Sequence, residues 1–233
     1  MLRKNGILFQ KLTANHVDAV AEFLLTNLPK TSPICQALGF ERQDYEAMYI
    51  PRITESLPFN LSAFATDEST GEIVAYHLDS FFYRDPFKNT PSPPKKTKKA
   101  QILASLSENL RKKFWHMCPR DINCVLRGES SCTREDYQRK GIGAVFLAAM
   151  FMDPRVQDSK QCGGLVAVST SYSNQKLLDS LGGENYAEIT YEAFFEKHGI
   201  SFKRALKDNT TKAVLQFVPA KMYLEEKRHI NRL

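Results

Sequence analysis

Cysteine is scarce in this 233-residue chain, and its spacing is irregular. The five cysteines form no C-x-x-C pair; they are Cys35, Cys118, Cys124, Cys132 and Cys162. An odd and scattered set provides neither a disulfide framework nor the paired spacing of a zinc site. We therefore expect reduced thiols and no bound metal.

Long hydrophobic runs are also absent. The longest extends from Gly143 to Met152, well short of the roughly 20 residues that a helix needs to cross a bilayer. The opening stretch MLRKNGILFQKL interrupts its apolar residues too early for a signal peptide. From these two absences we expect a soluble, cytoplasmic protein with no membrane partner.

Positive charge is in excess, with 32 Lys and Arg against 26 Asp and Glu and a net charge of +6. Part of this excess lies in KKTKKA, Lys95 to Ala100, just after a cluster of prolines. We expect residues 83–99 to form an exposed and mobile loop. No aromatic residues are interleaved with these lysines, so we expect no nucleic-acid partner.

Strand and helix patterns alternate along the whole chain. Strands are predicted at 6–13, as a hairpin within 61–82, and at 123–133, 163–171, 187–191 and 212–218. Helices are predicted at 14–28 (ended by Pro29), at 41–57 (bent near Pro51), at 101–115, after Gly143 and at 174–181, with a loop at 30–40. This alternation favours an α/β or α+β layered sheet, and the length favours a single domain, residues 1–233.

The most informative motif is QRKGIG, Gln138 to Gly143, directly before an apolar run. It lacks the third glycine of a dinucleotide-binding fingerprint, and Lys140 precedes the glycines instead of following them as in a P-loop. A plain turn into a core helix is the simplest alternative. Because glycine permits a tight turn and the first amides of a helix are free, a phosphate cradle is the functional alternative.

This motif resembles the Q/R-x-x-G-x-G/A signature of the GNAT acetyltransferase superfamily. The flanking pattern of that superfamily is present in order as VLRGESSCT, AVFLAAMFM, GLVAVST and NQKLLDSLGG. From STSYSNQKLLDSLGGENYAEITYEAF to VLQFVPA the chain resembles the arylalkylamine N-acetyltransferases, the insect dopamine type in particular. The resemblance implies a mixed sheet of about seven strands, flanked by helices and splayed between strands 4 and 5.

The resemblance implies acetyl-CoA as co-substrate and direct attack by a primary amine in a ternary complex. The pantetheine arm would lie along Ser131, Cys132 and Thr133. The remaining cofactor residues, mostly for the pyrophosphate, would be Gln138, Arg139, Lys140, Gly141, Ile142, Gly143, Ala144 and Asn174.

Acetyl transfer requires a neutral amine, so a group must accept its proton. In the vertebrate serotonin N-acetyltransferases, which this chain resembles, a histidine that removes the proton stands at the position of Glu129. Glu129 is therefore our candidate for the general base. Strand alternation places Glu129, Ser131 and Thr133 on one face. In a partly buried tunnel its pKa would be raised. The alternative is a structural carboxylate paired with Arg127 or Arg134.

The general acid that reprotonates the thiolate is often a tyrosine or a serine in this superfamily. Leu178 stands at the common tyrosine position, which leaves Tyr172 and Ser173 as candidates beside a structural role for each. His77 is either a second base or a packed strand histidine.

The insect dopamine enzymes have a glutamate and two serines where this chain has Ser32, Thr170 and Asn174. Ser171 and Ser173 lie close enough to substitute for the serines. The expected amine site comprises Ser32, Pro33, Ile34, Thr170 and Ser171.

The apolar residues of the loop at 30–40 favour an apolar or aromatic amine over a polyamine, which would need several carboxylates. We therefore expect a small arylalkylamine substrate. Two alternatives stay open, namely a catalytically impaired acetyl-CoA-binding regulatory module and an enzyme acting on a protein or peptide amine. The chain is expected to be a monomer or a homodimer.

Overall fold

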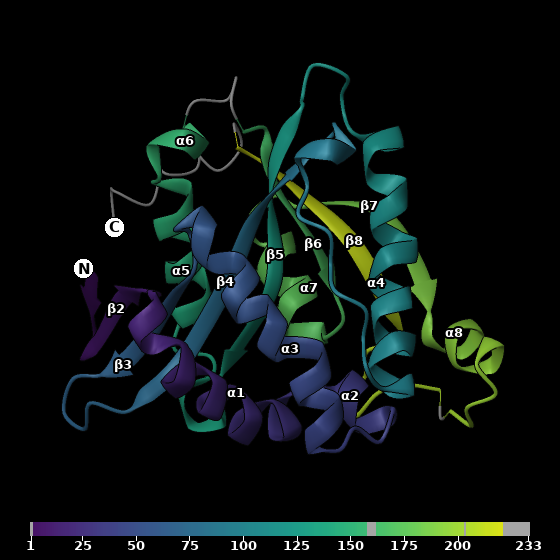
Figure 1. Ribbon diagram of the computed structural model, residues 1–233, viewed down its shortest axis with the longest axis horizontal. Helices are drawn as coiled ribbons and strands as arrows, with labels where there is room; N and C mark the ends of the chain where they lie inside the picture. Colours follow the sequence, from purple (N-terminus) through teal and green to yellow (C-terminus); the bar gives the residue numbers. More distant parts are fainter. Residues whose placement is uncertain (1, 158–161, 203, 221–233) are drawn as a thin grey trace.

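A single mixed sheet organises the computed structural model, which describes residues 2–157, 162–202 and 204–220. The strand order across it is β1-β2-β3-β4-β5-β6-β8-β7 (Figure 1). The strands are β1 (Leu2–Lys4), β2 (Ile7–Lys11), β3 (Ala63–Asp67), β4 (Ile73–Tyr83), β5 (Cys124–Thr133), β6 (Gly164–Ser169), β7 (Glu184–Thr190) and β8 (Lys212–Pro219). All neighbours are antiparallel except β5 and β6, which are parallel.

Helices cover both faces of this sheet. They are α1 (Val17–Thr31), α2 (Pro33–Ala37), α3 (Arg42–Ser56), α4 (Lys98–Met117), α5 (Ile142–Phe151), α6 (Pro154–Gln157), α7 (Tyr172–Asp179) and α8 (Tyr191–Lys197). Helices α1, α3 and α4 share one core with the sheet, whereas α5 and α7 pack on the opposite face (Figure 1). Among the described helices, none combines the length and apolar composition that a bilayer crossing requires.

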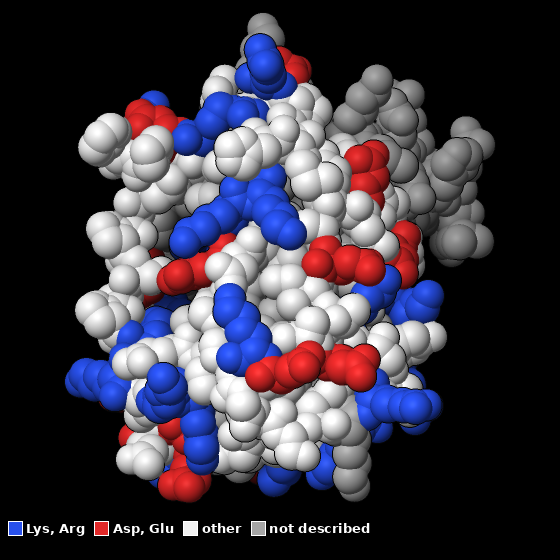
Figure 2. Space-filling view, turned by 90° about the vertical axis from the view of Figure 1, so that its right-hand side faces the viewer, with Lys and Arg blue, Asp and Glu red and all other residues white. Residues whose placement is uncertain are grey.

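Helix α4 shows how the sequence dictates this layering. Its buried residues recur three or four positions apart, at Leu103, Leu106, Leu110 and Phe114. That spacing forms one apolar stripe, which packs on the sheet with Phe114 fully buried against Phe217. The outward face of this side of the molecule carries interspersed basic and acidic side chains (Figure 2).

The predicted α/β architecture is confirmed, with differences at several elements. The extra strand is the short β1, and α6 and α8 were not predicted. Residues 33–37 form α2 instead of loop, with Pro33 in its first turn, where a missing amide proton costs nothing. Pro29 does not end α1, which continues to Thr31, and the side chain of Gln36 donates to the carbonyls of Pro29 and Lys30.

The sheet splays open in its middle, at the parallel junction of β5 and β6. Only Leu126 and Arg127 of β5 pair with β6, opposite Leu165 and Val166. The rest of β5 remains paired with β4 up to Thr133. The second half of β5 therefore has a free backbone edge. Because β1 is the additional strand, β5 and β6 are the predicted strands 4 and 5, and the splay lies between them as expected.

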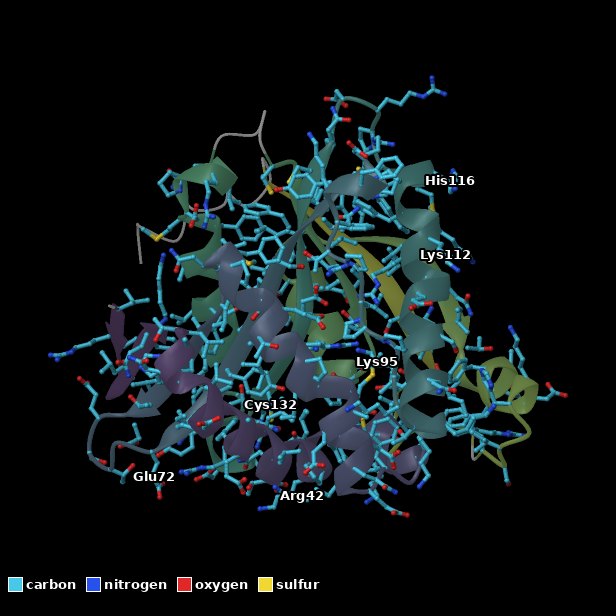
Figure 3. The ribbon with its side chains drawn as sticks, viewed as in Figure 1. Arg42, Glu72, Lys95, Lys112, His116 and Cys132 are labelled. Atoms are coloured by element: carbon cyan, nitrogen blue, oxygen red, sulfur yellow. The ribbon has the colours of Figure 1, made fainter. Side chains whose placement is uncertain are left out.

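The proline and lysine segment 83–99 has no buried residue and is held at its start by hydrogen bonds. The amide of Tyr83 donates to Asn89 Oδ1 at 2.8 Å, and Asn89 Nδ2 donates back to the Tyr83 carbonyl at 2.9 Å. Lys95 is half-buried and lies between α3 and α4 (Figure 3). This segment therefore passes between those two helices on its way to α4 (Figure 1).

Gly164, at the start of β6, should tolerate no side chain. A methyl group there would lie 2.3 Å from the Val218 carbonyl oxygen, and its φ is +148°. We expect Gly164→Ala to lower the free energy of unfolding by about 3 kcal/mol, since backbone must shift. Gly6→Ala is the control because it has φ +72° but no atom within 4 Å, and should cost about 1 kcal/mol. Equal losses in urea unfolding would contradict this account.

Candidate active site

The splay between β5 and β6 opens into a cavity of about 520 Å³. It extends from the turn before α5, along both strand edges, to α3 and α4. The predicted residues that line it are Ser32, Pro33, Glu129, Ser131, Cys132, Thr133, Gln138, Arg139, Gly141, Ile142, Gly143, Ala144, Thr170, Ser171, Ser173 and Asn174. The structure thus brings most of the predicted site to one cavity.

Three predicted residues lie away from this cavity. Ile34 is 1% exposed and packs in the core under α2. Tyr172 is 52% exposed on the outer side of α7. Lys140 points out of the turn, with its ammonium group 4.2 Å from the centre of the Tyr137 ring. None of the three lines the cavity.

The turn before α5 presents free backbone amides to the cavity. Arg139 and Gly141 have φ of +60° and +77°, which lets the chain reverse sharply into the helix. Ile142, Gly143 and Ala144 are the first three helical residues, so their amides have no partner within the helix. Together with the positive end of the helix dipole, these amides suit an anion such as a phosphate.

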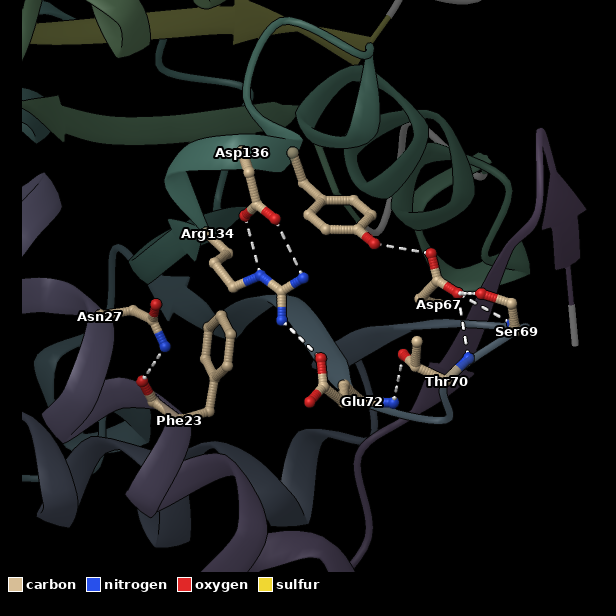
Figure 4. Close-up of polar contacts among 9 residues, drawn as sticks. Phe23, Asn27, Asp67, Ser69, Thr70, Glu72, Arg134 and Asp136 are labelled. Carbon is tan, nitrogen blue, oxygen red and sulfur yellow. Dashed lines mark hydrogen bonds and ion pairs between the residues drawn. The ribbon is translucent and has the colours of Figure 1, made fainter.

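Polar contacts fix this turn against the hairpin of β3 and β4. Arg134 makes two hydrogen bonds to the carboxylate of Asp136, at 2.8 and 3.1 Å, and one of 2.9 Å to Glu72 (Figure 4). The hydroxyl of Tyr137 donates to Asp67 Oδ2 at 2.6 Å. Hydrogen bonds from Ser69 and Tyr137 lower the pKa of Asp67, so this carboxylate stays ionised and holds the turn.

A β-bulge in β5 changes which side chains share a face. Leu78 pairs with Ser130 and Asp79 with Gly128, which leaves Glu129 as the extra residue. Ser130 Oγ then lies 2.8 Å from the Tyr76 hydroxyl, and Cys132 Sγ lies 3.2 Å from Thr31 Oγ1 of α1. Our prediction that Glu129 shares a face with Ser131 and Thr133 was therefore wrong, because simple alternation fails at the bulge.

Glu129 is held by arginine in the cavity wall. Its side chain is 10% exposed, and Oε1 accepts hydrogen bonds from Arg127 Nε at 2.6 Å and from Ser80 Oγ at 2.7 Å. Burial opposes ionisation, but Arg127, Arg52 and Arg111 outweigh it and lower the pKa of Glu129. Our prediction that the pKa of Glu129 would be raised was therefore wrong. Of the two arginines that we considered as ion-pair partners, Arg127 pairs with Glu129, whereas Arg134 pairs with Glu72 and Asp136.

Two arginines of the site were missed in the sequence. Arg52 of α3 donates from Nη1 to the Glu129 carbonyl at 2.6 Å and lies over the Tyr49 ring. Arg111 of α4 has Nη1 3.8 Å from Glu129 Oε2, and burial lowers its pKa to about 10. The sequence gives no signal for either residue, because each comes from a helix that meets β5 only in the folded chain.

His77 is packed and has an acidic partner two residues along β4. Its ring stacks on Phe146 of α5, and Nε2 lies 3.1 Å from Asp79 Oδ1, which is an ion pair when the imidazole is protonated. Burial opposes protonation, but Asp79 raises the pKa of His77 above its usual 6.5. The spacing of two residues on one strand was the available signal for this pair.

Ser171 and Ser173 begin α7 at the far wall of the cavity. Ser171 is the N-cap and accepts from the Asn174 amide at 3.4 Å, while its hydroxyl lies 3.3 Å from that of Ser173. Gly143 faces the same helix, since a Cβ there would lie 3.0 Å from Leu177. Helices α5 and α7 therefore bound the cavity at the end where the free amides lie.

Comparison with known proteins identifies the fold. No family model matches the chain, and no curated protein matches it in sequence. The Aedes aegypti protein named arylalkylamine N-acetyltransferase 7 superposes with a TM-score of 0.75 at 12% identity, over 92% of this chain and 87% of its own.

Two further solved structures agree with that match. The C-terminal condensation domain of Ebony, solved with beta-alanyl-dopamine, superposes with a TM-score of 0.67 at 17% identity, over 94% of this chain and 100% of its own. A Drosophila melanogaster polyamine N-acetyltransferase that forms N-acetylagmatine superposes with a TM-score of 0.60 at 14% identity, over 91% of this chain and 98% of its own. The chain has the fold of the GNAT N-acetyltransferases, as the resemblance predicted.

The His77–Asp79 pair should make stability depend on pH. Because the folded pKa of His77 is raised above 6.5, the pair contributes fully below that pH and is lost as pH rises through the folded value. Relative to His77→Gln, the wild-type protein should therefore lose unfolding free energy as pH rises above about 6.5. His116→Gln, at an exposed position on α4 (Figure 3), is the control. A pH-independent difference for His77→Gln would contradict the pair.

Proposed function

We propose that this protein, which has the GNAT fold, transfers the acetyl group of acetyl-CoA to a small primary amine with an arylalkyl skeleton. The observation that supports this most is the single cavity that joins the free amides of α5 to the charged wall around Glu129. A site for acyl transfer needs both ends, one to bind the acyl carrier and one to receive the amine.

The residues at the α5 end fit the proposed co-substrate. The amides of Ile142, Gly143 and Ala144 suit its pyrophosphate, and Arg139 and Lys176 add positive charge to the same part of the cavity wall. The free edge of β5 from Ser131 to Thr133 offers backbone groups to an extended arm. When bound, acetyl-CoA supplies an acetyl thioester, from which the amine displaces the CoA thiolate.

The wall around Glu129 suits an amine that must react in its neutral form. Guanidinium groups near an ammonium ion disfavour its charged state and lower its pKa, and Arg52, Arg111 and Arg127 all line this part. Glu129 remains our proposed proton acceptor. Its lowered pKa makes it a weak base. The amine therefore loses its proton largely because the three arginines lower the pKa of the amine itself.

The remaining lining favours an apolar or aromatic body on the amine. Leu28 and Met48 come from α1 and α3, Leu103 from α4, and Tyr49 and Tyr76 complete this part of the wall. Such a surface binds a flat hydrocarbon skeleton through burial of apolar area. An aryl group two or three bonds from the nitrogen would fit this description.

The proposed activity is tested by release of free CoA from acetyl-CoA with a panel of amines: tryptamine, dopamine, tyramine, octopamine, histamine, spermidine and a lysine peptide. We expect turnover of the arylalkyl members above that of spermidine. Absence of CoA release with every amine, alongside measured acetyl-CoA binding, would contradict the proposed function.

Glu129→Gln should lower kcat/KM by about tenfold or more, because the proton acceptor is lost and an arginine cluster is left unbalanced. Affinity for acetyl-CoA should stay within about twofold, since the free amides of α5 are untouched. The control is Glu196→Gln, at an exposed position on α8 away from the cavity lining. A Glu129→Gln protein with unchanged kcat/KM would remove Glu129 from proton transfer, and its unfolding midpoint shows whether it remains folded.

A further inference from the structure

The cavity wall around Glu129 carries an unbalanced positive charge. Arg52, Arg111 and Arg127 line it, and Glu129 is the one carboxylate among the described lining residues. This leaves two positive charges in excess at the end where the amine would bind. Lys95 and Glu55 lie close by without lining the cavity, and their opposite charges offset one another. The exposed carboxylate of Glu108, also outside the lining, offsets part of the charge of Arg111.

Arg127 and Arg52 are largely occupied within the wall. Arg127 forms its ion pair with Glu129 and also donates to Ser80 Oγ at 3.1 Å. Arg52 donates to the Glu129 carbonyl and packs over Tyr49. Their contacts fix the position of Glu129 and leave this carboxylate little capacity to neutralise a third guanidinium group.

Arg111 is the guanidinium group with a free binding capacity. Its side chain is 18% exposed, and across the described residues it makes no hydrogen bond and one ion contact, 3.8 Å from Glu129 Oε2. A guanidinium group has five N–H donors in a fork that matches a carboxylate. These donors open on the cavity, where an anionic ligand could accept them and would be stabilised by the guanidinium charge.

We propose that the amine acceptor carries a carboxylate that binds Arg111, so that the substrate is an amino acid with an apolar or aromatic side chain. This inference rests on the proposed function and names the substrate class of the same site. The arylalkyl skeleton occupies the apolar wall, and the carboxylate supplies the charge that the arginines lack. A polyamine or a guanidinium-bearing amine is disfavoured, because it would place a further cation against them.

Matched pairs of acceptors that differ only by the α-carboxylate provide the test. They are phenylalanine with 2-phenylethylamine, tyrosine with tyramine, and tryptophan with tryptamine. We expect kcat/KM to be about tenfold or more higher for the amino acid of each pair, the size of one charge-assisted hydrogen bond. Equal or higher kcat/KM for the decarboxylated amines would overturn the inference and leave the proposed function in place.

Arg111→Met tests the residue itself, because methionine keeps an unbranched apolar side chain without the charge. We expect it to bring the ratio of each pair close to one. Lys112→Met is the matched control, since Lys112 is the exposed neighbour on α4 and points away from the cavity (Figure 3). A ratio that Arg111→Met leaves unchanged in a folded protein would overturn the assignment.

Binding of product-like compounds separates this inference from the activity. Calorimetry of the CoA-loaded protein should show tighter binding of N-acetylphenylalanine than of N-acetyl-2-phenylethylamine, by about tenfold, and loss of this difference in Arg111→Met. If this result accompanies no turnover of any amine, the proposed function fails while the carboxylate site stands. Equal binding of the two compounds would overturn the carboxylate site.

Discussion

The parting of β5 from β6 is the constraint on which the rest of the site depends. Two parallel strands in the middle of a sheet normally remain hydrogen-bonded along their length, but here they pair only at Leu126 and Arg127 of β5. Beyond that point one backbone edge of β5 is free, while the other edge stays paired with β4 up to Thr133. The cavity, the exposed edge and the approach to α5 all follow from this one departure from a regular sheet.

The two ends of the cavity solve different electrostatic problems. At α5 the positive character comes from backbone amides and the helix dipole, which need no buried charged side chain. At the other end it comes from three arginines, of which Arg127 and Arg52 are held by Glu129. Burying such a cluster costs stability. A site with one carboxylate among three guanidinium groups is therefore better suited to receive an anion than to bind a second cation.

Sequence reasoning succeeded where the determinants are local. The glycines of the α5 turn, the strand before it and the helix after it are encoded within a few residues, so the turn could be predicted without the fold. It failed for Glu129 because a bulge is a property of two paired strands, visible only once β5 is aligned with β4. Arg52 and Arg111 were out of reach for a similar reason, since α3 and α4 converge on β5 only through packing in the core.

The most direct test of the central claim is amide hydrogen exchange with and without acetyl-CoA. If the splay is the acyl-carrier site, the ligand should slow exchange at Ser131 and Thr133, which face the free strand edge, and at Ile142 to Ala144, whose amides lie at the open start of α5. Protection confined to other segments, or unchanged exchange at both of these under saturating acetyl-CoA, would contradict the account.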